Sequence, residues 1–513
     1  MNTEAQNKNN KRLVIVGGGS AGWLTAAIFA AHHKSYLADS VQVTLVEASD
    51  IPTVGVGEGT WPTMKNTLKS IGIKESDFFR ECHAAFKQGG KFANWVKEKD
   101  EFYYHPFTFP LGYGNIDLAP YVADIDKFCE QSNFQHHVCE AGLAPRTLAE
   151  QEYQGKCNYA YHLDAGAFAD LLKRHCISKL GVKHVVATVR TVETDDQGNI
   201  DRIYFNEDTI APISGDIFVD CTGFSSLLLG KTLGVEFHST GDILFNNSAL
   251  AVQIPYESTD NPIATHTIAI GQEVGWTWDI GLTNRRGVGY VYSSDFTNDD
   301  AAIVTLANYL GKKPDDIQPR KIAFESGHRK IFWKNNCVAI GLSAGFVEPL
   351  EATALMLIEV SARFLAENWP VDPMLNSLIA KRFNEQMHYR WRRILDFLKL
   401  HYVLTQRQED YWQENTRPES IPDSLREDLS IWQYRGPVTN DFNSAMELFP
   451  AASYQYVIYG MGFKPHFDQQ PWLFDQQVQA EKILARNQQV TDQMLRSLPR
   501  HREMINNWLA NTN

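Results

Sequence analysis

The chain has 513 residues, of which 43% are hydrophobic and 21% are charged, a composition typical of a globular protein. Its formal net charge of -13 at pH 7 leaves no basic block that could displace counterions, which argues against a nucleic-acid partner. No apolar run reaches the roughly eighteen residues of a membrane span, and segment 1–10 lacks a signal-peptide core. The cysteines are scattered and form no CxxC pair. We therefore expect a cytoplasmic protein with no membrane partner and no metal site.

Residues 11–23, KRLVIVGGGSAGW, predict a buried strand, a glycine-rich turn and the start of a helix. The run 13–16 is short and apolar throughout, as in parallel strands that are buried on both faces. The pattern GxGxxG follows at once, and its glycines serve a tight turn, the approach of backbone to a pyrophosphate, and close helix–strand packing. The helix predicted over 24–31 offers the free amides of its N-terminus to phosphate. The candidate cofactor-binding residues in this stretch are Gly17, Gly19, Ser20, Ala21 and Gly22.

A second predicted strand, 41–46, is followed by Glu47 at the offset usual for an acid that binds a ribose hydroxyl. The strand–helix–strand unit predicts a dinucleotide site, although these residues alone do not separate NAD from FAD. The next stretch, 51–64, contains three glycines and two prolines, so its backbone can approach a ligand closely. Because this stretch follows the second strand, we expect Gly57 and Glu58 beside the cofactor.

Lys87 and the aromatic stretch 101–113 are the first candidates for chemistry away from the glycine turn. Lys87 follows Phe86 and shortly precedes a pair of glycines. A surface lysine is the ordinary interpretation, but an apolar, glycine-rich environment can desolvate a lysine and make it reactive. The stretch EFYYHPFTFPLGY surrounds His105 with aromatic rings and is compatible with a pocket wall or with a buried β-hairpin.

The middle of the chain predicts alternating strands and helices. Residues 161–175 predict the entry of a helix with Asp164 as its N-cap, and 182–193 and 200–206 predict strands on either side of a turn. The apolar run 217–223, IFVDCTG, predicts another buried strand. In two-domain flavoproteins such a strand returns to the dinucleotide site, which favours FAD over NAD. Candidate cofactor contacts in this part of the chain are Val189 and Asp220.

Residues 249–292 are rich in predicted strands, and a β-layer inserted in a dinucleotide fold commonly carries the substrate side of the flavin. Residues 338–355 predict a third apolar strand, a glycine-containing turn, and a helix that starts at Pro349 or Glu351. The amides of that helix start could face the isoalloxazine or an anion. From about Met374 onward the hydrophobic pattern is helical.

These elements predict an α/β fold in which a Rossmann-like FAD-binding domain of the flavin-monooxygenase type carries an inserted β-sheet layer and a C-terminal helical subdomain. The expected FAD-binding domain is 1–375, with its β-layer at about 84–110 and 245–295. The expected helical subdomain, on the substrate side, is 376–513. No internal repeat or low-complexity linker interrupts the chain.

Taken together, the motifs resemble those of the FAD-dependent tryptophan halogenase family, in the same order and along nearly the whole chain. VGGGSAGW at 16–23 resembles the opening turn of the family, and GVGEGTWP at 55–62 resembles its flavin-side loop, VGEATxP. YHPF at 104–107, DCTGF at 220–224 and HYVLTQR at 401–407 are similar to further family segments.

Two family motifs are present with departures. The block 341–355 is similar to G-x-A-G-F-x-E-P-L-E-S-T-G, but its end reads EATA at 351–354. The Cβ of Ala354 restricts the backbone where the family has glycine, which bears on halide binding. The signature WxWxIP reads WTWDIG at 276–281, with Gly281 in place of proline. Both indoles remain, so we expect the wall that they form between flavin and substrate to stand.

The resemblance implies roles for particular residues. Lys87 stands where the family carries its catalytic lysine, which polarises hypohalous acid or captures it as a haloamine. Glu351 would orient the oxidant, stabilise the positive charge that grows on the ring, or help to remove the ring proton. Thr353 and Ala354 would hold halide through their backbone amides. The implied substrate pocket comprises His105, Phe107, Trp276, Trp278 and Tyr454, and further candidate cofactor contacts are Leu342 and Leu355.

The implied reaction uses reduced FAD from a separate flavin reductase, oxygen, and chloride or bromide to make hypohalous acid. The acid would travel through an internal tunnel to Lys87 and halogenate tryptophan, indole or another electron-rich aromatic ring. Ser-Tyr at 453–454 stands where relatives often carry Ser-Trp, so the substrate itself is not carried over. A homodimer is a further family-level expectation.

Two other functions stay open at this point. A flavin monooxygenase would hydroxylate its substrate directly, which Gly281 would permit, although the retained indoles at 276 and 278 argue against it. A non-catalytic flavoprotein would act as a binding module or carrier, although the retention of Lys87 and Glu351 argues against that function.

Overall fold

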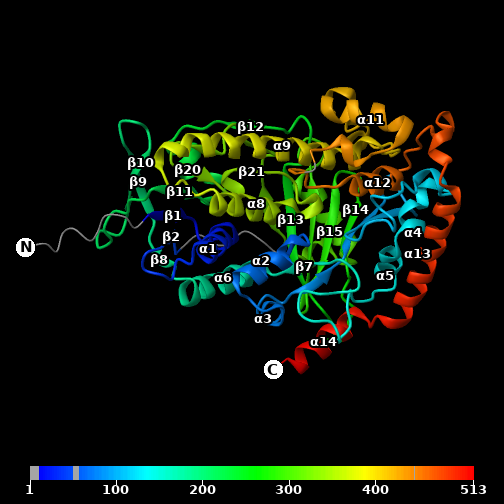
Figure 1. Ribbon diagram of the computed structural model, residues 1–513, viewed down its shortest axis with the longest axis horizontal. Coiled ribbons are helices and arrows are strands. Elements are labelled where there is room, and N and C mark those ends of the chain that lie inside the picture. Colours follow the sequence, from blue (N-terminus) through cyan, green and yellow to red (C-terminus); the bar gives the residue numbers. More distant parts are fainter. Residues whose placement is uncertain (1–10, 50–56, 444, 513) are drawn as a thin grey trace, which may run out of the picture.

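The computed structural model describes residues 11–49, 57–443 and 445–512, and Figure 1 shows how their helices and strands are arranged. In these ranges a sheet with the strand order β19-β20-β11-β1-β2-β8 carries the glycine-rich turn. Its strands run parallel except for β19, which is antiparallel to β20. The strands are β1 (Arg12–Val16), β2 (Gln42–Glu47), β8 (Lys183–Val186), β11 (Ile217–Asp220), β19 (Trp333–Lys334) and β20 (Cys337–Ala339).

Strand β1 lies inside this parallel sheet, and its register places Val16 opposite Val46 of β2 and Asp220 of β11. The apolar run in β1 is buried, as expected of a parallel strand covered on both faces. The strands predicted around 13–16, 41–46 and 217–223 therefore end at the same edge. Ligands of open parallel sheets bind at this carboxyl edge.

A second, mostly antiparallel sheet has the order β17-β13-β16-β15-β14-β5-β6 among the described residues. Strand β5 pairs in parallel with β14, so the segment just after Lys87 joins the predicted β-layer. The aromatic stretch contributes β6, which forms a hairpin with β5. The strands are β5 (Gly89–Ala93), β6 (Phe102–Pro106), β13 (Ser248–Pro255), β14 (Thr267–Gly271), β15 (Trp276–Gly281), β16 (Arg285–Tyr292) and β17 (Arg320–Ala323).

Smaller sheets complete the strands of the described ranges. In one of them β7 (Ala160–Leu163) lies between β3 (Glu58–Gly59) and β4 (Ala85–Lys87), which brings the flavin-side loop close to the strand of Lys87. The other short strands are β9 (Val189–Thr194) and β10 (Ile200–Phe205), which form a hairpin, and β12 (Phe237–Ser239), β18 (Gly327–Arg329) and β21 (Gly345–Phe346).

Helices cover the sheets, and the yellow-to-red helices of the C-terminal part gather above and beside the seven-stranded sheet in Figure 1. Helix α1 packs between its neighbours α6 and α8 next to the parallel sheet. The helices are α1 (Ser20–His33), α2 (Thr63–Ile71), α3 (Glu75–Glu81), α4 (Phe128–Ser132), α5 (Phe134–Glu140), α6 (Ala165–Lys179), α7 (Asp299–Leu310), α8 (Thr353–Glu367), α9 (Asn376–Val403), α10 (Asp410–Glu414), α11 (Asp423–Arg435), α12 (Ala451–Gly460), α13 (Gln477–Ser497) and α14 (His501–Asn511).

The starts of α1 and α6 differ from the sequence prediction. Helix α1 begins at Ser20, earlier than predicted, because Gly19 takes an extended conformation and ends the turn there. Residues 160–163 form strand β7 rather than the entry of a helix. The predicted N-cap of α6 is confirmed, since the Asp164 carboxylate accepts a hydrogen bond of 3.0 Å from the Ala167 amide. Of the predicted loop 51–64, residues 51–56 lie outside the described ranges.

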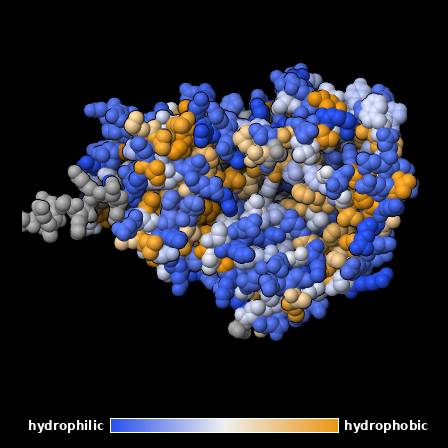
Figure 2. Space-filling view, viewed as in Figure 1, coloured by the Kyte–Doolittle hydropathy of each residue, from blue (hydrophilic) through white to orange (hydrophobic). Residues whose placement is uncertain are grey.

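The predicted mixed α/β architecture and the helical C-terminal region are confirmed. One apolar core extends from β1 and α1 to α14. All seven cysteines are buried free thiols. In the described ranges, no helix combines the length and the apolar character that a bilayer crossing demands. Figure 2 shows a largely hydrophilic face on which hydrophobic residues are scattered.

Candidate functional site

One cavity of about 810 Å³ connects the carboxyl edge of the parallel sheet with the seven-stranded sheet. The residues predicted for cofactor binding and those predicted for chemistry lie around this same space. The predicted residues in its lining are Gly17, Gly19, Ser20, Ala21, Glu47, Gly57, Glu58, Lys87, Phe107, Val189, Trp276, Trp278, Leu342, Glu351, Thr353, Ala354 and Leu355.

The glycine turn has the geometry that a diphosphate needs. Gly17 has φ +118°, and a Cβ there would lie 2.1 Å from the Cys221 carbonyl oxygen. A Cβ on Gly22 would lie 1.9 Å from the carbonyl oxygen of Gly17, so a glycine is needed for the helix to pack closely against the strand and its turn. Gly22 itself lies outside the cavity lining. A Cβ on Gly19, by contrast, would meet open space. No side chain caps the start of α1, which leaves its first amides available to a phosphate.

Glu47 and Glu58 both bring carboxyl groups to the lining of the cavity. Glu47 Oε1 lies 2.8 Å from His184 Nε2 and forms an ion pair with Lys173. Its Oε2 accepts a hydrogen bond of 3.3 Å from the indole of Trp23. A carboxylate held in this way keeps lone pairs for a ribose hydroxyl. Burial raises the pKa of Glu58 to about 7. The turn and the fixed acid together fit FAD.

Helix α8 presents its N-terminus to the cavity. It begins at Thr353 rather than at the predicted 349 or 351, because Glu351 and Ala352 have φ values of 64° and 55°. No side chain caps this helix, so the first-turn amides of Thr353 and Ala354 suit an anion such as halide. Ala354 lies within the regular helix, where a Cβ causes no strain. The left-handed positions, at which glycine would be favoured, are the two residues before it.

Lys87 also lines the cavity and is only 4% exposed. Its Nζ makes no hydrogen bond or ion pair with any residue that the structure describes, and it lies 5.3 Å from the centroid of the Phe107 ring. Burial lowers the pKa of Lys87 to about 8, opposed by the charge of Glu351. Gly59 makes room for the amine, because a Cβ there would lie 3.0 Å from Nζ. The lysine is therefore desolvated, not a surface residue.

The Glu351 carboxylate is held by two buried histidines. His105 Nδ1 lies 2.9 Å from Oε1, and His401 Nε2 lies 3.3 Å from the same oxygen. The backbone carbonyl of Glu351 accepts a hydrogen bond of 2.8 Å from the Trp61 indole. Burial opposes ionisation, but His105 and His401 outweigh it and hold the pKa of Glu351 well below its usual range. The side chain therefore faces the cavity as an anion.

The two indoles predicted to form a wall between flavin and substrate both line the cavity. Trp276 and Trp278 are buried in β15 and line the cavity together with Ile280, since alternate residues of a strand share a face. Gly281, the departure from the family signature, lies outside that lining. A Cβ there would meet Ile263 at 2.8 Å and the Tyr256 hydroxyl at 3.1 Å instead. The change therefore does not alter the lining of the cavity.

Gly22, Asp220 and His105 lie outside the lining, although each supports it. The buried Asp220 carboxylate accepts hydrogen bonds of 2.8 Å from the amides of Leu228 and Leu229. It thereby holds the turn after β11 in place from behind, and does not face the cavity. His105 acts on Glu351, as described above, and not as an exposed pocket wall.

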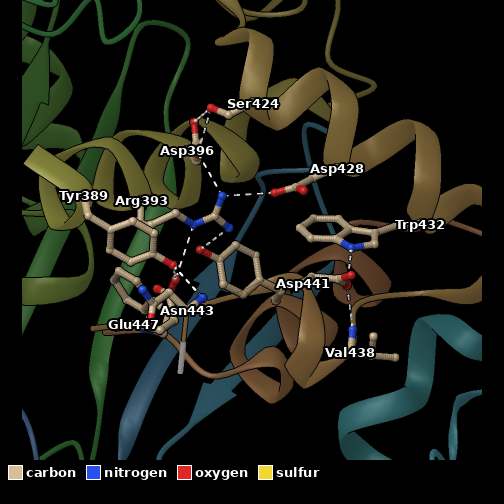
Figure 3. Close-up of polar contacts among 12 residues, drawn as sticks. Tyr389, Arg393, Asp396, Ser424, Asp428, Trp432, Val438, Asp441, Asn443 and Glu447 are labelled. Atoms are coloured by element: carbon tan, nitrogen blue, oxygen red, sulfur yellow. Dashed lines mark hydrogen bonds and ion pairs between the residues drawn. The ribbon is translucent and has the colours of Figure 1, made fainter. Parts of the chain in front are cut away.

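Tyr454 also lies outside the lining, in a separate polar cluster. Its hydroxyl accepts a hydrogen bond of 2.9 Å from Arg393. The same guanidinium lies 3.0 Å from the carboxylates of Asp396 and Asp428, and Ser424 donates to Asp396, as Figure 3 shows. The predicted substrate contact of Tyr454 is therefore not part of this arrangement.

The sequence comparisons identify the family. The model of the tryptophan halogenase family matches residues 12–473. The chain belongs to the tryptophan halogenase family. The 7-chloro-L-tryptophan 6-halogenase KtzR of Kutzneria sp. (strain 744) is 35% identical over 478 residues, 88% of this chain and 90% of the relative. The tryptophan 7-halogenase RebH of Lentzea aerocolonigenes is 33% identical over 447 residues, 82% of each chain.

Solved structures agree with this assignment. A tryptophan halogenase from Shewanella frigidimarina NCIMB 400 matches with a TM-score of 0.94 and 43% identity, covering 98% of each chain. A tryptophan C-6 flavin-dependent halogenase (chlorinase) from taromycin biosynthesis matches with a TM-score of 0.89 and 32% identity, covering 98% of this chain and 100% of the other. The predicted halogenase family and fold are confirmed, and the monooxygenase alternative is not favoured.

Three residues next to the site were not singled out in the sequence. His401 opens the segment HYVLTQR, but nothing in the segment showed that it meets Glu351. Tyr103 precedes His105 by two residues in β6, and alternate residues of a strand share one face. This spacing could have predicted that the two side chains lie on the same side of the strand. Ser453 belongs to the Ser-Tyr pair at 453–454, but nothing in that pair showed that it meets His105, because only the fold brings α12 to His105.

Proposed function

We propose that this chain uses reduced FAD, oxygen and a halide to make hypohalous acid, and delivers that acid to Lys87 for halogenation of an electron-rich aromatic ring of the indole class. The observation that carries the proposal is the single cavity that joins the glycine turn to Lys87, whose amine is buried. A neutral oxidant made at the flavin end could reach the amine inside the protein.

The flavin end has residues for the cofactor and for the halide. Gly17, Gly19 and the start of α1 would hold the diphosphate of FAD, and Glu47 would bind its ribose. When bound, reduced FAD supplies the activation of oxygen that protein side chains cannot supply. The amides of Thr353 and Ala354 would hold the halide, because a helix N-terminus stabilises an anion.

Lys87 would carry the halogen as an amine. Its nitrogen forms a bond to the halogen of hypohalous acid, the bond between oxygen and halogen breaks, and water leaves. The aromatic ring then takes the halogen, loses a proton and returns the free amine. With a pKa of about 8, roughly a tenth of the lysine is amine at pH 7, against about 0.03% for an exposed lysine. The absence of a hydrogen-bond acceptor for Nζ among the described residues also favours the neutral amine.

Glu351 would act mainly as a fixed negative charge. Its lowered pKa keeps it ionised over the working pH range, so it can stabilise the positive charge that develops on the attacked ring. A weak base is sufficient to remove the ring proton afterwards, because the positively charged ring is a strong acid.

The names of the relatives point to the substrate class. KtzR is named for a chlorinated tryptophan and RebH for tryptophan, which supports an indole ring as the acceptor here. The family resemblance also implies a separate flavin reductase as the source of reduced FAD. The predicted homodimer stays a prediction.

The test is a halogenation screen of the purified protein with reduced FAD and oxygen, in chloride or in bromide. A panel of tryptophan, other indoles and phenols is analysed by mass spectrometry. We expect a halide-dependent product with the isotope pattern of chlorine or bromine on at least one indole. Hydroxylation without halide would establish a monooxygenase instead, and an inert protein across the panel would favour a non-catalytic flavoprotein.

A further inference from the structure

The two histidines that hold Glu351 converge on one of its oxygen atoms. His105 Nδ1 and His401 Nε2 lie 2.9 Å and 3.3 Å from Oε1. Oε2 accepts no hydrogen bond from the residues that the structure describes. His401 Nε2 makes no hydrogen bond of good geometry with the described residues, and its charged neighbour there is Oε1 of Glu351, at 3.3 Å. The carboxylate therefore has one anchored oxygen and one oxygen left for the reaction.

The second nitrogen of each histidine meets a hydroxyl group. His105 Nε2 lies 2.8 Å from the Ser453 hydroxyl oxygen, and His401 Nδ1 lies 2.7 Å from the Tyr103 hydroxyl oxygen. Tyr103, Ser453 and both imidazoles are buried, so water does not compete for these contacts. The chain of contacts is Ser453–His105–Glu351–His401–Tyr103.

The donors and acceptors of this chain can be assigned in one consistent way. An ionised carboxylate only accepts hydrogen bonds, so the imidazole nitrogen that faces it must carry a proton. A neutral imidazole has one such proton, and its other nitrogen must then accept one. A serine or tyrosine hydroxyl can donate there. His105 is then the Nδ1–H tautomer, and His401 is the Nε2–H tautomer.

We propose that Tyr103 and Ser453 are positioning residues which fix opposite neutral tautomers of His401 and His105, so that both histidines donate to Oε1 of Glu351 and Oε2 alone serves the reaction. This inference rests on the proposed function of Glu351. Without the Tyr103 hydroxyl, His401 can turn to its other tautomer and set a lone pair against Oε1. The carboxylate would then lose a donor and its fixed orientation.

Burial supports a neutral imidazole at His401. It lowers the pKa of His401, while the charge of Glu351 opposes the change. The other faces of His401 meet the rings of Phe92, Trp95 and Phe397, which offer no acceptor for a second proton.

Strand β6 offers a matched control. Tyr104 follows Tyr103, points to the other face of the strand, and contacts a carboxylate and a histidine of its own, Glu140 and His266. Tyr104→Phe therefore removes a buried hydroxyl from the same strand without touching the contacts of Glu351. Any general effect of such a loss on β6 would appear in both variants.

The experiment measures the tautomers directly, by NMR of the FAD-bound protein with 15N-labelled histidine, with His401→Gln used to assign the signal. We expect a neutral Nε2–H signal for His401 in the unmutated protein and in Tyr104→Phe, and a mixture of tautomers in Tyr103→Phe. Steady-state bromination of an indole should show a roughly tenfold lower kcat in Tyr103→Phe with little change in KM. Ser453→Ala should act likewise on His105, and Ser453→Thr should restore its tautomer.

A charged imidazolium at His401, or an unchanged His401 tautomer in Tyr103→Phe, would overturn the inference. The NMR measurement needs no turnover. An unmutated protein that carries the expected tautomers but halogenates nothing would therefore refute the proposed function and leave the hydrogen-bond assignment standing.

Discussion

Two buried clusters of charge in this molecule are built in opposite ways. In the cluster of Figure 3, the Arg393 guanidinium meets Asp396 and Asp428 at 3.0 Å and Glu447 at 3.3 Å. It also donates a hydrogen bond to Tyr454. These contacts tie α9 to α11, to the segment that contains Glu447, and to α12.

In the candidate active site, by contrast, charged groups keep atoms without partners. Lys87 Nζ makes no polar contact with the described residues, and only one oxygen of Glu351 is anchored. A buried charge with several partners fixes geometry, whereas a buried charge with few partners is free to react. The comparison predicts that mutations in the first cluster reduce stability and that mutations in the second reduce turnover.

Lys87→Ala should have the largest effect on turnover. Halogenation should fall by at least about 1,000-fold, because the amine that carries the halogen is gone. FAD affinity should be unchanged, and the free energy of unfolding should stay within about 1 kcal/mol, since relief of desolvation offsets lost packing. Turnover is measured by mass spectrometry of the product, FAD affinity by flavin titration, and the free energy of unfolding by urea unfolding. Lys91→Ala is the control, because Lys91 lies on the next strand, β5, and is ion-paired with Glu140 of α5. Undiminished turnover in Lys87→Ala would contradict the proposed role.

Arg393→Met should have the largest effect on stability. It leaves several buried carboxylates without their cation, so the free energy of unfolding should fall by about 3–5 kcal/mol. Urea unfolding of the FAD-bound protein measures the loss, and kcat per folded molecule should be nearly unchanged. Arg382→Met, on the exposed face of the same helix, should change stability by less than about 0.5 kcal/mol. Equal losses in both variants would refute the contrast between the clusters.

The pH dependence of turnover sharpens the comparison. Burial lowers the pKa of Lys87 to about 8, so the ammonium form dominates below that pH and the amine dominates above it. If the amine carries the halogen, kcat should rise roughly tenfold between pH 7 and pH 9, with its midpoint near 8. A pH profile of bromination under saturating substrate measures this. A flat or falling profile would instead assign to Lys87 the role of an ammonium that only polarises the oxidant.

Local signals made part of this molecule predictable from its sequence. The apolar run before the glycine turn and the spacing of Gly17, Gly19 and Gly22 depend on neighbouring residues, and the fold confirms the strand and the turn. The burial of Lys87 was not predictable in that way, because it depends on β3 and β7, which come from distant segments.

Long-range contacts and backbone strain explain most of what the sequence left open. His401 meets Glu351 only because α9 passes beside the start of α8. The left-handed conformations of Glu351 and Ala352 place that start at Thr353, and no residue type in the block signals them. The division of the chain after 375 stays a prediction.

Gly59→Ala should have the smallest effect, and it tests how closely the site is packed around its free amine. The family loop has alanine here, but in this chain a Cβ at 59 would lie 3.0 Å from Lys87 Nζ and 3.2 Å from the Cβ of Ala352. The end of the lysine must then move by a few tenths of an ångström, which should lower kcat roughly threefold. Ala352→Gly in the same chain removes one of the two contacts and should restore part of the loss. Gly166→Ala, in the first turn of α6, is the control and should leave kcat unchanged. If Gly59→Ala brominates as fast as the unmutated protein, the position of Nζ does not limit the reaction, and the amine reaches its substrate from more than one place.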